Sequence, residues 1–166
     1  MNLTTLPART TAAVLAALTG GCSGVQVRTA IEIEAPAQRV WNVLVDFAHY
    51  PDWNPYHVSV EGEARVGAPL SVHVLRPDGK RVHIEPHVLR LVEQRELTWG
   101  GGIRGVFYGE HVLRIEPIEP GRIRLVHDED FTGFAVRFAD LPPAVLTEGY
   151  ERMNRALKAR VEAQAG

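Results

Sequence analysis

Cysteine and lysine are scarce in this chain of 166 residues, which contains one cysteine, Cys22, and two lysines, Lys80 and Lys158. A single cysteine excludes an internal disulfide, and a domain of this length buries enough surface to fold without one. The other basic residues are scattered arginines, and 18 basic against 20 acidic residues give a formal net charge of −2. This balance provides no basic field for nucleic acid, so we expect no nucleic-acid partner.

The sequence also lacks the local patterns of two common kinds of active site. None of the serines, Ser23, Ser59 and Ser71, stands in a nucleophile-elbow context. The glycine run at residues 100–105 precedes a predicted strand rather than a helix, so it does not match a phosphate-binding loop. We therefore predict no serine nucleophile and no cofactor, and we interpret the glycine run as a flexible loop that forms a mobile lid.

A long hydrophobic run is missing as well, because the uncharged stretch of residues 11–19 is too short to span a bilayer as a lasting helix. Residues 18–22, LTGGC, resemble a bacterial lipobox, although Thr19 stands where leucine is usual and Arg9 is the only basic side chain before it. The resemblance implies a signal peptide over residues 1–21, a lipid on Cys22 and a tether over residues 22–24. It places the protein on the periplasmic side of a bacterial cell envelope. The alternatives are a Sec-type segment without lipid and a disordered extension of a cytoplasmic protein.

Hydrophobic periodicity predicts one strand, one helix, a series of strands and a closing helix. Alternation predicts the first strand over residues 25–33, and helical spacing from Val40 to Phe47 predicts a helix that begins near Pro36. Pro51 and Pro55 limit residues 49–54 to a turn or a short helical piece. Further strands are predicted over residues 57–63, 70–76, 81–92, 96–99, 107–116 and 122–131. A helix over residues 144–162 carries one apolar face, which predicts that it packs on the concave side of the sheet.

Several motifs in this order resemble the SRPBCC superfamily, which includes START, Bet v 1 and polyketide cyclase/dehydrase-like proteins. They are IEAPAQRVW at residues 33–41, Asp46-Phe47, Tyr50-Pro51, Trp53-Asn54-Pro55, the strand from Gly109 to Pro117, and HDEDFTG at residues 127–133. The resemblance covers residues 25–163 as one domain. It implies an α+β helix-grip fold, in which a curved antiparallel sheet wraps a long C-terminal helix and encloses a hydrophobic cavity.

Strand alternation predicts three titratable side chains inside this fold. His111 and His127 share a face with apolar neighbours on two adjacent strands, and Glu129 follows His127 on the same face. A buried carboxyl group needs a partner, which leaves three interpretations. The cluster is a structural or ligand-anchoring patch, a general acid–base pair, or a two-histidine, one-carboxylate metal site. No spacing motif supports the metal site, so we predict none.

Aromatic and amide side chains complete the predicted site. Trp53, Asn54 and Tyr56 follow the first helix, where the cavity mouth is expected, and Trp99 is expected in the cavity wall. The other histidines, at positions 49, 57, 73, 83 and 87, are predicted to be exposed. These residues predict a protein that binds a small hydrophobic or lipid-like ligand. The alternatives are a cofactor-free cyclase/dehydrase-like enzyme with a histidine–glutamate pair, and an interaction module without a cavity.

Overall fold

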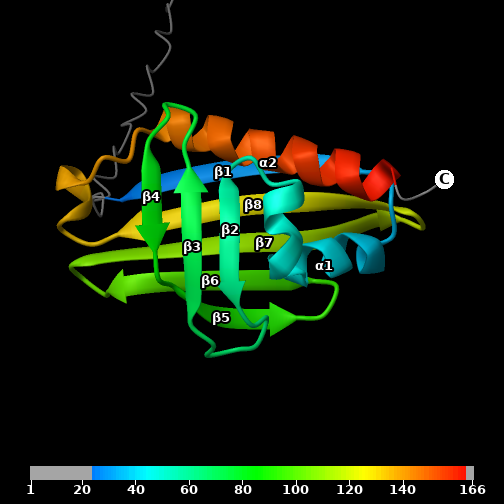
Figure 1. Ribbon diagram of the computed structural model, residues 1–166, viewed down its shortest axis with the longest axis horizontal. Coiled ribbons are helices and arrows are strands. Elements are labelled where there is room, and N and C mark those ends of the chain that lie inside the picture. Colours follow the sequence, from blue (N-terminus) through cyan, green and yellow to red (C-terminus); the bar gives the residue numbers. More distant parts are fainter. Residues whose placement is uncertain (1–23, 164–166) are drawn as a thin grey trace, which may run out of the picture.

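The computed structural model describes residues 24–163, so the predictions for the signal peptide of residues 1–21 and for Cys22 lie outside the described residues. The described part consists of two antiparallel sheets, two α-helices and two short 3-10 helices (Figure 1). The predicted α+β helix-grip fold is confirmed, with the curved surface divided between two sheets. Within the described residues, no helix has both the length and the apolar character needed to cross a bilayer.

The elements follow one another in the predicted order. The strands are β1 (Val25–Ile33), β2 (His57–Gly62), β3 (Leu70–Leu75), β4 (Arg81–Ile84), β5 (His87–Val92), β6 (Glu96–Ile103), β7 (Phe107–Glu119) and β8 (Arg122–Thr132). The helices are α1 (Ala37–Val45), the 3-10 helix η1 (Phe47–Asp52), the 3-10 helix η2 (Val136–Phe138) and α2 (Pro143–Ala163). Pro36, with φ −66° and ψ 148°, forms the N-cap of α1, where its missing N–H costs nothing.

The prediction of one strand over residues 81–92 is wrong, because Pro86 divides it into β4 and β5. The large sheet has the order β1-β8-β7-β6-β5 and the small sheet the order β2-β3-β4. Pro86 has no N–H to donate to a ladder, and the chain passes from one sheet to the other at this residue. The two sheets stay joined there, since the Leu70 N–H donates to the Pro86 carbonyl at 2.8 Å.

The prediction of a flexible glycine loop and lid at residues 100–105 is also wrong. Strand β6 continues through Ile103 and pairs with β7, with Gly101 opposite Gly109. A Cβ atom on Gly100 would lie only 2.5 Å from the Gly109 carbonyl oxygen. The glycines therefore let two strand backbones approach closely, and they leave one part of the sheet without side chains.

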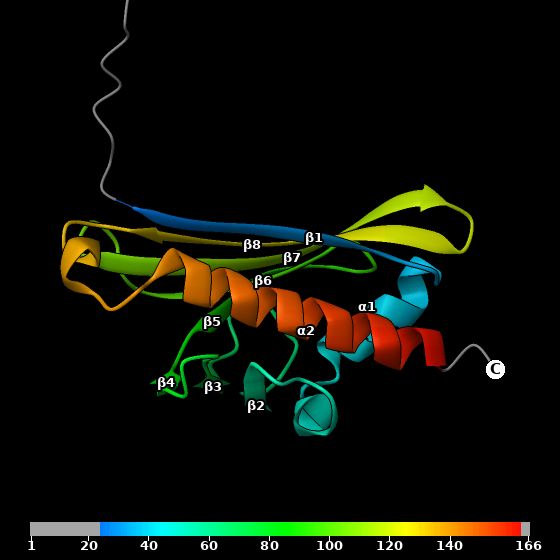
Figure 2. The same cartoon turned by 90° about the horizontal axis from the view of Figure 1, so that it is seen from above.

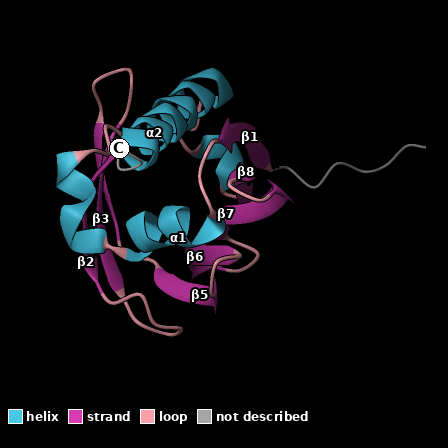
Figure 3. Cartoon of the chain, turned by 90° about the vertical axis from the view of Figure 1, so that its right-hand side faces the viewer, coloured by secondary structure: helices cyan, strands magenta, loops and turns pink. Residues whose placement is uncertain are grey.

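Helix α2 closes the interior along the β1 edge of the large sheet (Figures 2 and 3). The apolar face predicted for this helix is confirmed, since Leu146, Tyr150, Met153, Leu157 and Val161 are all buried. Seen from the side, α1, α2 and the two sheets surround one interior (Figure 3). The polar residues discussed below lie in that interior, between the large sheet and α2.

Candidate functional site: a buried histidine cluster beside a cavity

The large sheet places the predicted polar residues in two neighbouring cross-strand rows. His111 on β7 pairs directly with Trp99 on β6 and with Glu129 on β8. In the next row Leu113 pairs with His127, which lies opposite Thr29 on β1. His111 and His127 are 2% and 0% exposed, so the prediction that these side chains face the interior is confirmed.

His57 joins these two residues from the small sheet, although the sequence predicted it to be exposed. Its ring centroid lies 5.0 Å from that of His111, and only 2% of the residue is exposed. The register of β2 shifts between His57 and Ser59, because His57 pairs with Val74 and Ser59 with His73. Such a bulge reverses the alternation at one point of a strand. His57 therefore faces inward, while the later residues of its parity face solvent.

Aromatic rings enclose this histidine cluster of His57, His111 and His127. Trp99 stacks on His111 with centroids 4.7 Å apart, and Tyr150 of α2 stacks on His127 at 4.2 Å. His111 and His127 meet edge to face at 4.6 Å. Stacking of this kind fixes ring orientation and excludes water from the ring faces.

A hydrogen-bond network fixes the protonation of His127. The Nδ1–H of this ring donates to Asn154 Oδ1 at 2.8 Å, with the amide orientation set by a second bond from Asn154 Nδ2 to Thr29 Oγ1 at 3.0 Å. The Thr29 hydroxyl in turn donates to the His127 carbonyl at 3.0 Å. The Nε2 atom of His127 is therefore an acceptor, and it has no hydrogen-bond partner among the described residues.

His111 has no comparable network. Neither of its ring nitrogens has a hydrogen-bond partner among the described residues, and the same holds for Nδ1 of His57. The nearest carboxyl oxygen, Oε2 of Glu129, lies 3.5 Å from His111 Nδ1, which is too far for a good hydrogen bond. A buried polar atom without a partner costs about 1–3 kcal/mol, so a bound group that supplies the missing partner gains a corresponding advantage.

Burial keeps this part of the interior uncharged at neutral pH. It lowers the pKa of His111 to about 3 and lowers the pKa values of His57 and His127 below their ordinary range. Burial, assisted by the negative charge of Asp130, raises the pKa of Glu129 to about 8. The contact between His111 and Glu129 is therefore not an ion pair at pH 7, and the protonated Glu129 carboxyl group can donate a hydrogen bond.

Two adjoining pockets with a shared wall, which we treat as two lobes of one cavity, lie directly beside these residues. One lobe has a volume of about 230 Å³ and is lined by the β6 glycines, Pro86, Gly109 and Phe107. The other has a volume of about 170 Å³ and is lined by Tyr56, His57, His111, Tyr150 and several apolar side chains. The shared wall consists of Ile84, Trp99, Phe107, Glu129 and Phe131.

The shape of the cavity depends in part on two glycines, Gly109 and Gly149, which have no side chain. Gly109 lies under the Glu129 carboxyl group, whose Oε1 would be 3.5 Å from a Cβ at that position. Gly149 of α2 makes room for the Tyr56 ring, since a Cβ there would lie only 2.2 Å from Tyr56 Cε2. Any side chain at these two positions would occupy the site or displace a wall residue.

Four of the predicted site residues line the cavity: Tyr56, Trp99, His111 and Glu129. His127 lies behind them against Tyr150. Asn54 Oδ1 accepts backbone hydrogen bonds from Tyr56 at 3.0 Å and His57 at 2.9 Å, so it positions two site residues without lining the cavity. Trp53 packs on Tyr50 at 5.0 Å and faces a separate surface crevice beside Arg160.

Sequence reasoning missed His57, Tyr150 and Asn154 as members of the site. Tyr150 and Asn154 are four residues apart on the predicted apolar face of the last helix, and an amide on such a face is a signal for a buried polar partner. Arg76, also missed, is 6% exposed, lines the smaller lobe and binds Asp78 at 2.7 Å and Asp140 at 3.0 Å. Among residues 24–163 no group of three or more His, Cys, Asp or Glu side chains has the arrangement of a metal site.

Comparison with known proteins assigns the family. Residues 24–162 match the model of the family described as polyketide cyclase/dehydrase and lipid transport, so the chain belongs to that family. No curated protein matches the sequence.

Solved structures with the same fold are similar over most of this chain. An aromatase/cyclase from Streptomyces sp. R1128 has a TM-score of 0.70 at 19% identity, covering 86% of this chain and 96% of its own. A START superfamily protein from Mycobacterium smegmatis has a TM-score of 0.65 at 22% identity, covering 84% and 98%. A point mutant of norcoclaurine synthase from Thalictrum flavum, in complex with a transition-state analogue, has a TM-score of 0.67 at 15% identity, covering 86% and 97%. At these identities the likeness shows the fold alone.

Proposed function

We propose that this protein binds a small, mainly apolar or lipid-like molecule in the cavity and acts as a carrier or binding protein. The observation that supports this most directly is the set of buried ring nitrogens without partners beside an apolar cavity. Together the two lobes reach the lower end of the range of about 300–1,000 Å³ that is typical of small-molecule sites. Burial of apolar ligand surface supplies most of the binding energy, at about 25 cal/mol per Å².

The polar residues of the wall set the chemistry of the ligand's polar end. Glu129, protonated at neutral pH, is a donor, and His111 offers one donor and one acceptor nitrogen. A neutral carbonyl or hydroxyl group fits these partners. A carboxylate placed beside Glu129 would oppose deprotonation further and gain little, so we favour an uncharged ligand.

Native mass spectrometry of protein purified gently from membranes tests the proposal. We expect a co-purified small molecule in the unmodified protein. Ile84→Trp fills the wall shared by both lobes and is expected to remove the molecule, whereas the control Val92→Trp, on an exposed strand end, should retain it. Equal occupancy in both variants would contradict binding in this cavity.

A second candidate is a cofactor-free enzyme of the cyclase/dehydrase type, with His111 and Glu129 as the acid–base pair. The observation that favours it is the pKa of Glu129, which lies close to neutral pH beside an unpartnered imidazole. Replacement of His111 and Glu129 by apolar isosteres separates the two functions. A carrier keeps most of its affinity, while an enzyme stops converting its ligand, which mass spectrometry of the bound molecule reveals as loss of the converted product.

We also propose that a lipid on Cys22 tethers the domain to the periplasmic side of a bacterial cell envelope. The lipobox-like residues 18–22 support this. A diacylglyceryl mass on a chain that begins at Cys22 is the expected result of the same mass spectrometry. A chain of unmodified mass that retains residues 1–21 would contradict it and would favour the cytoplasmic alternative.

A further inference from the structure

One end of the molecule exposes four large apolar side chains that the ligand site does not use. Ile103, Val106, Phe134 and Phe138 are 68%, 37%, 58% and 75% exposed. We call these four residues the apolar rim. They come from the β6–β7 turn and from the segment between β8 and α2, which is drawn at the left of Figure 1. Clusters of exposed apolar side chains on a folded domain mark interaction surfaces.

Backbone contacts hold the two parts of the rim together. The Phe134 N–H donates to the Gly105 carbonyl at 3.1 Å, and the Ala135 N–H donates to the Val106 carbonyl at 2.9 Å. Gly133 has φ 112°, and a Cβ there would lie 2.3 Å from the Val106 oxygen, so only glycine permits this contact. The fold therefore holds the segment that carries Phe134 against the β6–β7 turn, with the Phe134 side chain exposed.

The charges around the rim are basic. Arg104 and Arg137 lie within its two segments, with their guanidinium groups over the rings of Tyr108 and Phe138 at 4.2 and 4.7 Å. Two of the carboxylates on neighbouring segments are paired with cations: Asp130 with Arg28 at 2.6 Å, and Asp140 with Lys80 at 2.6 Å. An apolar surface flanked by unneutralised arginines is complementary to a bilayer with anionic headgroups.

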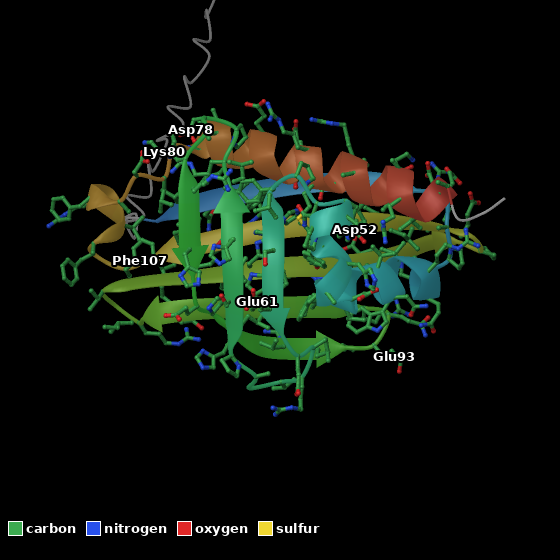
Figure 4. The ribbon with its side chains drawn as sticks, viewed as in Figure 1. Asp52, Glu61, Asp78, Lys80, Glu93 and Phe107 are labelled. Carbon is green, nitrogen blue, oxygen red and sulfur yellow. The ribbon has the colours of Figure 1, made fainter. Side chains whose placement is uncertain are left out.

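The rim borders the cavity and the point where the described chain begins. Gly102 and Phe107, which line the larger lobe, are next to Ile103 and Val106 in the chain (Phe107 is labelled in Figure 4). Val25, the first residue of β1, pairs with Phe131, another wall residue, in the same cross-strand row as Gly109. The 23 residues before Gly24, which include the apolar stretch at 11–19, therefore join the domain at this end.

We propose that the apolar rim docks on an anionic lipid surface and turns the glycine-lined lobe of the cavity toward the bilayer. Phe134 and Phe138 enter the interfacial region, and Arg104 and Arg137 contact phosphate groups. The docking proposal depends only on the apolar rim and on Arg104 and Arg137 beside it. The consequence that a ligand passes between the lipid and the cavity rests on the proposed carrier function.

A probe placed on the rim tests the docking locally. Cys22→Ser removes the only cysteine, so Val106→Cys in the full-length chain accepts a single environment-sensitive fluorophore, and Ile118→Cys at the opposite end of the sheet is the control. We expect vesicles of phosphatidylcholine with phosphatidylglycerol to shift and quench the probe at 106, and not the probe at 118, when the lipid carries a bromine quencher. Equal signals at both positions would overturn the proposal.

Variants of the rim give a second measurement. Phe134→Ser with Phe138→Ser, in the Cys22→Ser chain, should lower partition onto the same vesicles by at least about tenfold. Val92→Ser with Ile118→Ser, which removes similarly exposed apolar residues at the far end, should leave it unchanged. Arg104→Gln with Arg137→Gln should weaken binding to anionic vesicles and not to phosphatidylcholine alone. Unchanged thermal unfolding shows that each variant is folded.

The outcomes separate docking from ligand binding. If the rim variants lose lipid binding while wild-type protein carries no ligand, the docking surface stands and the carrier function fails. If wild-type protein carries a ligand and the rim variants bind vesicles as it does, the docking proposal fails alone. Concentration-dependent dimers that the two serine substitutions dissolve would assign the rim to a second copy of the chain and would also overturn it.

Discussion

The two ends of the interior are built from the same strands but are packed differently. At the α1 end, the rows of the large sheet present Ile33, Leu113, Ile115, Ile123 and Leu125, all nearly inaccessible to solvent. At the other end, the same strands present Gly101, Gly109 and Phe131, and the cavity replaces the missing side chains. The histidine cluster lies at the boundary. One sheet therefore combines a packed core with a cavity, because residue size changes along its strands.

The largest expected effect contrasts the two ends directly. Leu125→Ala leaves an unfilled space in the packed end and should lower the free energy of unfolding by about 3 kcal/mol. Ile84→Ala, at the cavity wall and 36% exposed, should cost less than about 1 kcal/mol. Urea denaturation of both variants measures the contrast. Equal losses would show that the cavity end is packed as tightly as the core.

The pH dependence of stability tests whether Glu129, at the cavity end, is protonated in the folded state. Because the pKa of Glu129 rises from 4.5 in the unfolded chain to about 8 in the fold, the folded state binds a proton that the unfolded state releases across this range. The Glu129 contribution therefore weakens as pH rises through this window. Relative to wild type, Glu129→Gln should become more stable by about 3 kcal/mol between pH 5 and pH 8.

The buried histidines change stability with pH in the direction opposite to Glu129. The pKa of His111 in the fold is about 3, against 6.5 in the unfolded chain, so stability is retained above pH 6.5 and lost as pH falls toward 3. Both the wild type and Glu129→Gln contain these histidines, so the difference between the two unfolding curves isolates Glu129. A difference that does not vary with pH would show that Glu129 is ionised in the fold.

A single added methyl group probes the cavity wall from the helix side. At an exposed position in a helix, a change from glycine to alanine stabilises the helix by about 1 kcal/mol, because alanine has the higher helix propensity. In Gly149→Ala the new Cβ meets the Tyr56 ring at 2.2 Å, so we expect a net destabilisation of about 1.5 kcal/mol and a displaced ring. Glu151→Ala, exposed on the same helix, should change thermal unfolding little. Stabilisation by Gly149→Ala would show that Tyr56 has free space to move.

The smallest effect concerns the hydrogen bond that orients His127. Asn154→Leu removes the acceptor of the Nδ1–H and should lower stability by about 1 kcal/mol. It should also release the ring to its other tautomer, which the nitrogen chemical shifts of the imidazole report. Thr29→Val removes only the outer bond of the network and should leave the tautomer unchanged. An unaltered tautomer in Asn154→Leu would contradict this account.

Prediction from sequence succeeded where a pattern is repeated over many residues. Alternation along β7 and β8 identified the inward positions of His111 and His127, and helical spacing identified the buried face of α2. Prediction failed where a single residue changes the course of the chain or the face to which a strand's side chains point. Pro86 transferred a strand to another sheet, and the bulge after His57 turned a predicted surface histidine into a member of the site.

The sequence by itself determined the order of the elements, the helix-grip fold and the largely apolar character of the interior, because periodicity and composition are local properties of the chain. Only the tertiary structure decided which polar atoms meet. His57 and Asn154 are distant in sequence from His111 and His127, and their contacts with these two histidines depend on the register of the strands and on the position of α2. It also decided that glycines of β6 and β7 border a cavity, since the space that an absent side chain leaves depends on what packs opposite to it.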